Sequence, residues 1–129
     1  MTPKKLDEAF AVLIDGCSPS DRECYVKSQA ALKACDDELF EYEWLWKAAG
    51  GDGESCDWLA DTFCHGHGVA VDYDLAFFWA KKGALCGSGD CCYRLAHFYE
   101  YPNDKWYDFD LAMFRFREGI RRQSHEVMD

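Results

Sequence analysis

The chain repeats itself at a fixed spacing, and this property limits its fold more than any other. The segment from Leu59, LADTFCHGHGVAVDYDLAFFWAKKGA, aligns without a gap with the segment from Leu95, LAHFYEYPNDKWYDFDLAMFRFREGI, so the offset is 95 − 59 = 36 residues. Apolar, acidic and glycine positions recur in both copies, as at Asp72 and Asp108. A period of about 20 to 50 residues is typical of proteins that stack one supersecondary unit on the next. The sequence therefore predicts a repeat protein whose core continues from unit to unit.

Each unit has the residue spacing of helices rather than the alternation of strands. Gly66 and Gly68, in the glycine-rich HGHGV, are expected to turn the chain at positive φ, and Asp72 is expected to cap the helix that follows. We therefore predict an all-α chain with two helices per repeat. The positions expected on one helix face are Trp58, Leu59, Thr62 and Phe63 before the glycines, and Tyr73, Ala76, Ala80 and Ala84 after them.

The segment from Leu59 also follows a known repeat pattern, L-G-x-x-Y-x-x-G-x-G-V-x-x-D-x-x-x-A-x-x-W-x-x-K-A-A-x-x-G. The chain meets this pattern at Leu59, Ala60, Phe63, Gly66, Gly68, Val69, Asp72, Ala76, Trp79, Lys82, Ala84 and Gly87. It thus resembles the Sel-one-like repeat (SLR) family, whose members are related to the tetratricopeptide repeats. The resemblance implies a short right-handed α/α superhelix, a solenoid of about seven antiparallel helices in pairs.

The resemblance covers roughly residues 37–120 of a single domain, 1–129. Residues 1–36 have helical character and are expected to form N-terminal capping helices, and residues 121–129 are expected to form a C-terminal tail. The copy from Leu95 departs from the pattern, with Pro102 and Asp104 in place of the loop glycines and Arg115 in place of the tryptophan. Whether this degenerate copy is an end cap or a contact surface stays open.

The charge of the chain excludes some classes of partner. The sequence has 14 Lys and Arg residues against 24 Asp and Glu residues, for a net charge of −10. Such a surface repels the phosphates of nucleic acid and attracts a basic protein surface. No apolar run approaches the roughly 20 residues that cross a bilayer, so we expect no membrane contact.

The eight cysteines allow two interpretations. The start MTPKKLDEAFAVLIDG lacks a clean signal-peptide core, so we expect a cytoplasmic protein with reduced, mostly buried thiols. A secreted, cysteine-rich branch of the SLR family implies instead a β-lactam-binding or hydrolysing protein with disulfides between paired helices. The first cysteine of the K-A-C-x7-C arrangement of that branch is alanine in this chain, at Ala49 and Ala84. A count of free thiols under denaturing conditions distinguishes the two interpretations.

Cys64, His65 and His67 fall within four residues and are the strongest metal-ligand candidates. A tetrahedral zinc site needs a second pair of ligands, and none follows nearby in the sequence. The repeat accounts for the segment without a metal, because its glycines turn the chain between helices. We therefore predict no metal and no other cofactor, and interpret both histidines as loop residues at a repeat edge.

Motifs of catalysis are not found either. The sequence has no G-x-S-x-G elbow and no cysteine with an identifiable histidine base, and GGDGES at 50–55 lacks the lysine of a phosphate-binding loop. We therefore predict that the protein is not an enzyme and has no catalytic residue.

Aromatic residues interleaved with acids indicate where a partner binds. Phe77, Phe78 and Trp79 are consecutive, so at least one must face outward from its helix. By likeness to short SLR proteins, we predict a non-catalytic module that binds another protein, most specifically an immunity protein that neutralises a cognate bacterial toxin. The alternative is a general signalling or assembly adaptor. The expected partner-binding residues are Tyr42, Trp46, His65, His67, Phe77, Tyr101, Asp104, Trp106, Tyr107 and Asp108.

Overall fold

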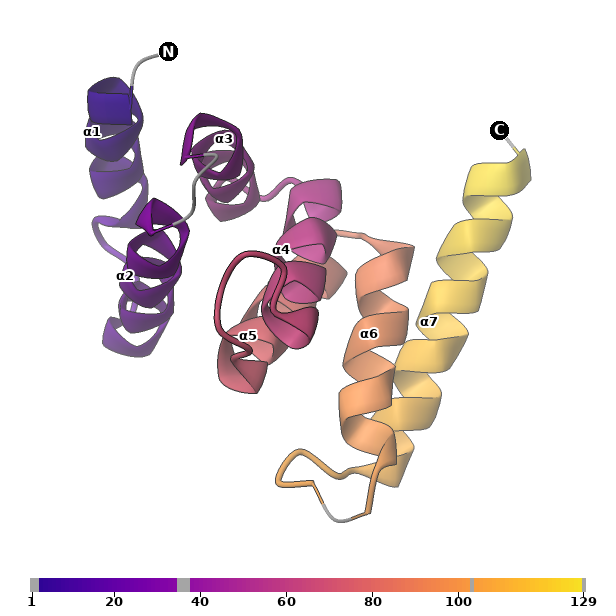
Figure 1. Cartoon of the computed structure of the whole chain (residues 1–129). Coiled ribbons are helices and arrows are strands. Elements are labelled where there is room, and N and C mark those ends of the chain that lie inside the picture. The colour runs from indigo at the N-terminus through magenta and orange to yellow at the C-terminus, as the bar shows by residue number, and fades with distance from the viewer. Residues whose placement is uncertain (1–2, 35–37, 103, 129) are drawn as a thin grey trace.

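The computed structural model describes residues 3–34, 38–102 and 104–128, with side chains for residues 5, 8–34, 43–102 and 104–123. Over this part of the chain it contains seven α-helices and no strand, which confirms the predicted all-α class (Figure 1). The helices are α1 (Pro3–Ile14), α2 (Pro19–Lys33), α3 (Glu38–Ala49), α4 (Gly53–His65), α5 (Tyr73–Leu85), α6 (Gly89–Glu100) and α7 (Phe109–Met128).

The helices follow one another across the molecule in chain order. Figure 1 shows α1, α2 and α3 at one end, α4 and α5 in the middle, and α6 and α7 at the other end. Helix α4 packs against α5 and α6 packs against α7, while α5 also contacts α6. The described helices therefore contact mainly their neighbours, as expected where a hydrophobic core continues from one unit to the next.

The repeat seen in the sequence is also present in the backbone hydrogen bonds. The N–H of Asp72 donates to the carbonyl oxygen of Phe63 at 2.9 Å, and the N–H of Asp108 donates to that of Tyr99 at 2.9 Å, an offset of 108 − 72 = 36 residues. Both aspartates then cap the next helix. The Asp72 carboxylate accepts from the N–H of Leu75 at 3.0 Å, and the Asp108 carboxylate accepts from the N–H of Leu111 at 3.1 Å.

The turns between repeats match as well. The N–H of Asp52 donates to the carbonyl oxygen of Lys47 at 3.0 Å, and the N–H of Ser88 donates to that of Gly83 at 2.9 Å. The preceding residues, Gly51 and Gly87, have φ angles of 102° and 103°. The glycines of HGHGV turn at positive φ as predicted, with 71° at Gly66 and 79° at Gly68.

Two buried glycines let α6 approach both of its neighbours closely. A Cβ atom on Gly83 of α5 would lie 2.2 Å from the sulfur of Cys91, and one on Gly119 of α7 would lie 2.9 Å from the ring of Tyr93. These glycines are 119 − 83 = 36 residues apart, so a glycine recurs at the equivalent position of successive repeats, although Gly83 faces the helix after it and Gly119 faces the helix before it.

Aromatic side chains join the N-terminal helices to the repeats. Trp79 of α5 is fully buried, and its indole Nε1 donates a hydrogen bond to the hydroxyl of Ser28 of α2 at 2.9 Å. Tyr25 of α2 packs edge-on against Phe78, with ring centroids 5.2 Å apart. Trp79 therefore fills the space between α5 and α2.

Helix α7 continues to Met128 and so includes most of residues 121–129, which we predicted as a C-terminal tail. No proline interrupts this segment, and Arg121 and Arg122 contact the Glu118 carboxylate at 2.9 and 3.2 Å from one turn away. Such pairs three and four residues apart stabilise a helix. These ion pairs therefore stabilise α7 beyond residue 120, where the repeat pattern ends.

Candidate functional site

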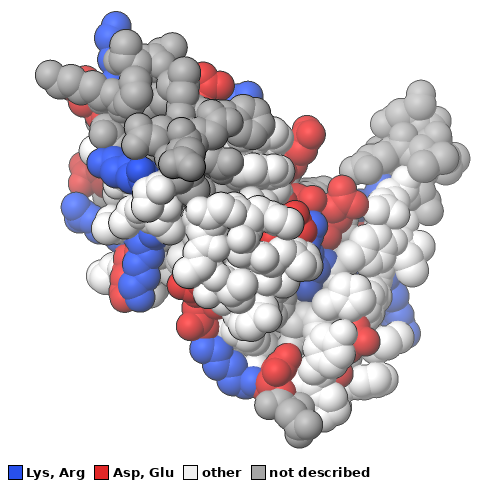
Figure 2. All heavy atoms as spheres, viewed as in Figure 1, with Lys and Arg blue, Asp and Glu red and all other residues white. Residues whose placement is uncertain are grey.

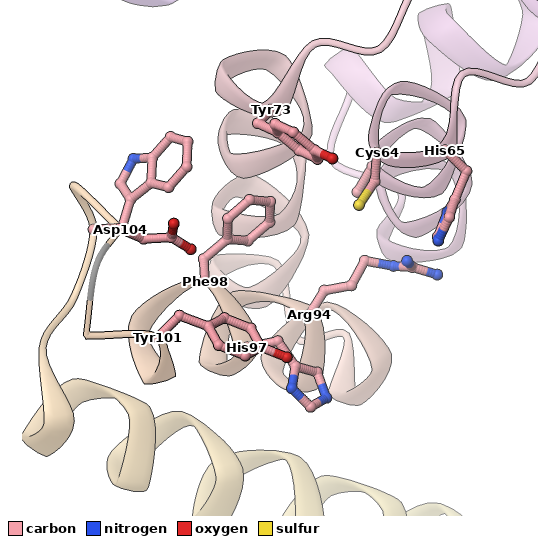
Figure 3. Close-up of a pocket in the computed structure, with 10 residues that line it drawn as sticks. Cys64, His65, Tyr73, Arg94, His97, Phe98, Tyr101 and Asp104 are labelled. Atoms are coloured by element: carbon pink, nitrogen blue, oxygen red, sulfur yellow. The ribbon is translucent and has the colours of Figure 1, made fainter.

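A groove of about 490 Å³ lies between α4 and α6 and is the candidate functional site (Figure 3). Helix α4, the start of α5, helix α6 and the connection between α6 and α7 all contribute side chains to it. The site therefore spans two successive repeats. Its lining residues are Ala60, Cys64, His65, Tyr73, Arg94, His97, Phe98, Tyr101, Asp104 and Trp106.

One end of the groove rests on a cluster of three aromatic rings. The ring of Phe77 stacks on that of Trp106 with centroids 5.1 Å apart, and Phe98 meets Trp106 edge-on at 5.1 Å. Trp106 and Phe98 line the groove, whereas Phe77 supports the Trp106 ring and does not line it. The cluster fixes the α6–α7 connection against α5 and α6. Phe77, which we predicted as a partner contact, is half-buried and supports the Trp106 ring.

A lysine next to Trp106 adds to this end of the site. Lys105 Nζ lies 4.7 Å from the centroid of the Trp106 ring, and it forms an ion pair with the Asp74 carboxylate of α5. A cation over an indole face is a favourable electrostatic contact. Because Lys105 already contacts the Trp106 ring, a cation from a partner would have to contact other rings in the groove.

Two tyrosines and a carboxylate in the groove are available to a cation from a partner. Tyr73 and Tyr101 are 55% and 54% exposed, although both belong to the groove lining. Figure 3 shows the Asp104 carboxylate directed toward the Phe98 ring, with Tyr73 on one side and Tyr101 on the other. Aromatic faces together with a carboxylate attract the side chains of lysine and arginine.

Arg94 lies at the opposite end of the groove and joins α6 to α4. Its Nε donates to the Asp57 carboxylate at 2.7 Å and its Nη1 donates to the Asp61 carboxylate at 3.3 Å. Burial disfavours the charged guanidinium, but the hydrogen bond to Asp57 and the charges of both aspartates outweigh it and raise the pKa of Arg94. The arginine is held in its ionised form between two carboxylates, so it does not make this end of the groove basic.

The remaining predicted contact residues lie in several places. His65 lines the groove, while His67 lies beside Asp61, with Nε2 3.4 Å from its carboxylate. Trp46 lines a separate hollow of about 480 Å³ next to α1 and α3. Tyr107 is exposed and outside the groove lining. The side chain of Tyr42 lies outside the described residues.

Asp108 has a structural role, because it caps the helix that follows it. Its carboxylate caps α7 through the N–H of Leu111. A carboxylate that caps a helix contributes about 0.5–2 kcal/mol to stability. Asp108, which we predicted as a partner contact, thus has the same capping hydrogen bond as its counterpart Asp72.

Six lining residues were not predicted as partner contacts: Ala60, Cys64, Tyr73, Arg94, His97 and Phe98. Arg94 lies 37 and 33 residues after Asp57 and Asp61, which is close to one period. An arginine that follows two acids by one repeat length is placed to contact them between stacked units. That spacing is the signal that could have identified Arg94.

The seven described cysteines are free thiols, with Cys35 outside the described residues. Burial raises the pKa of Cys56 and of Cys91 to about 12. Burial also raises the pKa of Cys64 in the groove wall. These thiols stay protonated at neutral pH, which makes them poor nucleophiles and poor metal ligands.

No protein-family profile fits the chain, and neither the curated proteins nor the solved structures include a match to it. Among the described helices, none combines the length and the apolar character that a membrane crossing requires.

Proposed function

We propose that this chain is a non-catalytic helical-repeat protein of the SLR type, folded as a short α/α superhelix, and that it binds another protein in the groove between α4 and α6. The repeated turn and cap hydrogen bonds support the repeat assignment, because identical backbone bonds recur at an offset of 108 − 72 = 36 residues. The exposed tyrosines and the Asp104 carboxylate in one groove carry the binding proposal.

The proposed partner presents a lysine or arginine side chain to the groove. Tyr73 and Tyr101 supply exposed aromatic faces and Asp104 supplies an opposite charge. A cation over an aromatic ring gains about 0.5–1 kcal/mol at an exposed site and about 2 kcal/mol when water is excluded. Figure 2 shows a broad face of uncharged side chains over α4 and the loop after it, bordered by charged side chains. An interface with an uncharged centre and a charged rim fits this face.

The overall charge supports a basic partner. The chain carries a net charge of −10, and charges of opposite sign on two proteins accelerate their association. The specific form of the proposal is an immunity protein that occupies and neutralises a cognate bacterial toxin. A general signalling or assembly adaptor with a basic partner would use the same groove.

The experiment is affinity capture from cells of the natural host with the full chain and two matched variants. Asp104→Lys reverses a charge in the groove, and Asp15→Lys makes the same reversal at an exposed position after α1. We expect one basic protein, bound stoichiometrically by the natural chain and by Asp15→Lys, and lost with Asp104→Lys. Capture that is equal for both variants, or no stoichiometric partner, would contradict the proposal.

A second measurement separates the two forms of the proposal. The captured protein is expressed alone and together with the chain, and cell growth is recorded. An immunity protein restores growth that the partner alone prevents, and Asp104→Lys fails to restore it. Several non-toxic partners, each lost with Asp104→Lys, would support the adaptor instead.

A further inference from the structure

Three side chains with metal-binding atoms converge at the C-terminal end of α4. His65 Nδ1 lies 3.0 Å from the carboxylate of Asp61, one helical turn earlier, and His67 Nε2 lies 3.4 Å from the other oxygen of that carboxylate. One ligand atom from each of the three residues lies within 4.8 Å of the other two. From the sequence alone we considered Cys64 with the two histidines and predicted no metal; in the structure Asp61 lies beside the histidines, and Cys64 is not part of this cluster.

The backbone after α4 brings His67 back to the helix. Gly66 ends α4 in the left-handed conformation, with φ 71° and ψ 41°, and its N–H and that of His67 both donate to the carbonyl oxygen of Thr62. A Cβ atom on Gly66 would lie 3.0 Å from Val71, so a larger residue would disturb the turn. This turn fixes the place of His67 without using its imidazole ring.

We propose that Asp61, His65 and His67 bind a divalent transition-metal ion such as Zn²⁺, Co²⁺ or Ni²⁺. Two imidazoles and one carboxylate form a donor set suited to these ions rather than to Ca²⁺ or Mg²⁺, which prefer oxygen ligands alone. Ligand atoms about 2.0–2.2 Å from one ion lie about 3–3.5 Å from each other. The two distances to Asp61 already fall in this range, so small side-chain movements complete the site.

The surroundings of the cluster agree with a solvent-accessible site. The side chains of His65 and His67 are 56% and 61% exposed, which leaves an entry path and room for water at the open coordination positions. Arg94 Nη1 lies 3.3 Å from the carboxylate of Asp61 and is itself held by Asp57, so it orients the carboxylate from the side of α6. Partners of this kind, bonded to a ligand, commonly fix its orientation.

Cobalt is the most informative probe, because its absorption spectrum distinguishes thiolate ligands from nitrogen and oxygen ligands. The full chain without a histidine tag, stripped with a chelator and kept reduced with a phosphine, is titrated with Co²⁺. We expect one bound equivalent with visible ligand-field bands and no thiolate-to-cobalt charge-transfer band. Competition with Zn²⁺ should displace the cobalt from the same site.

His67→Gln and its control His97→Gln decide the assignment. His97 has a similar exposure of 57% and a carboxylate neighbour, Glu100, at 2.8 Å, but it does not belong to the three-residue cluster. We expect His67→Gln to weaken cobalt binding by at least roughly tenfold, as lost ligand-sphere contacts do, and His97→Gln to leave it unchanged. Circular dichroism checks that both variants keep their helices.

Three results would overturn this proposal. They are no cobalt binding at millimolar concentration, a thiolate charge-transfer band, and equal affinity in the natural chain and His67→Gln. The proposal does not depend on the protein-binding function, because cobalt is tested on the chain alone.

Discussion

At the scale of single residues, small side chains at fixed positions decide how closely the helices pack. Gly83 and Gly119 occupy equivalent positions, and each faces a side chain of α6 that leaves no room for a methyl group. A glycine in a helix costs about 1 kcal/mol relative to alanine, so its presence at both positions indicates that close packing outweighs helix propensity.

We expect Gly83→Ala to destabilise the protein by about 1–3 kcal/mol through overpacking. The added carbon would lie 2.2 Å from the sulfur of Cys91 and 2.9 Å from the Cβ of Cys56, so neither neighbour can yield by rotation alone. Urea unfolding followed by circular dichroism measures the effect. The control is Gly50→Ala, whose nearest contact would be an ordinary 3.5 Å. Equal stability of the two variants would show that α5 and α6 separate easily.

The cysteines make a second prediction at this scale. Cys86 is exposed, whereas Cys56 and Cys91 are fully buried and have a pKa of about 12. A disulfide reagent at pH 8 should react quickly with Cys86 and slowly with the two buried thiols, since the thiolate is the reactive form. Cys86→Ser should lower the number of fast-reacting thiols by one.

The same thiols give the direction of a pH effect on stability. Their pKa values are higher in the folded chain than in the unfolded chain, so their contribution to stability is complete below the unfolded pKa. This contribution is lost as the pH rises toward about 12.

In a denaturant, all eight cysteines should react with the disulfide reagent. A smaller count would support the disulfide-containing alternative.

At the scale of helices, the structure depends on contacts between elements far apart in the sequence. The hydrogen bond from Trp79 to Ser28 joins α5 to α2 across 51 residues and is fully buried. It links residues 1–36, where no repeat is visible, to the recognisable repeats. The two N-terminal helices are therefore packed onto the array rather than merely attached to its end.

We expect Ser28→Ala to cost about 1–3 kcal/mol, because the indole N–H of Trp79 would be buried without an acceptor. The free energy of unfolding in urea measures the loss. Ser20→Ala, at an exposed position of the same helix, serves as the control and should change stability little. A loss of less than about half a kcal/mol for Ser28→Ala would mean that water satisfies the indole.

At the scale of the whole molecule, stability is expected to vary with position along the row of helices. Helices α4, α5 and α6 each pack against helices on more than one side, whereas α1 packs mainly against α3 and α7 mainly against α6. In arrays of this type, each unit is stabilised mainly by its neighbours. The ends therefore have less support than the middle.

Amide hydrogen exchange tests this distribution. We expect the amides of α5 to exchange more slowly than those of α1 and of the end of α7, because opening an end breaks only one interface. Mass spectrometry of peptides from each helix gives the rates. Uniform protection from α1 to α7 would show instead that the chain opens only as a single cooperative unit.

The sequence predicted the helices well because their signals are local. The Asp72 cap and the glycines at positive φ follow from a few adjacent residues and a recurring pattern. The groove was predicted only in part. His65, Tyr101, Asp104 and Trp106 were named, but Tyr73 and Phe98 became groove residues only through the packing of α6 beside α4. The replacement of Cys64 by Asp61 beside the histidines likewise depends on how the turn at Gly66 directs the loop, which residue types alone do not specify.

The matching turns at the two repeat boundaries have a consequence for protein engineering. The chain from Gly53 to Ser88 spans 88 − 53 + 1 = 36 residues and is bounded at both ends by the same turn hydrogen bond. A tandem duplicate of this segment would therefore form the same turn at its new boundary as at the natural boundary. The number of copies of this segment sets the length of the molecule and the number of surfaces that face a partner. A longer scaffold can therefore be made without redesigning any turn between helices.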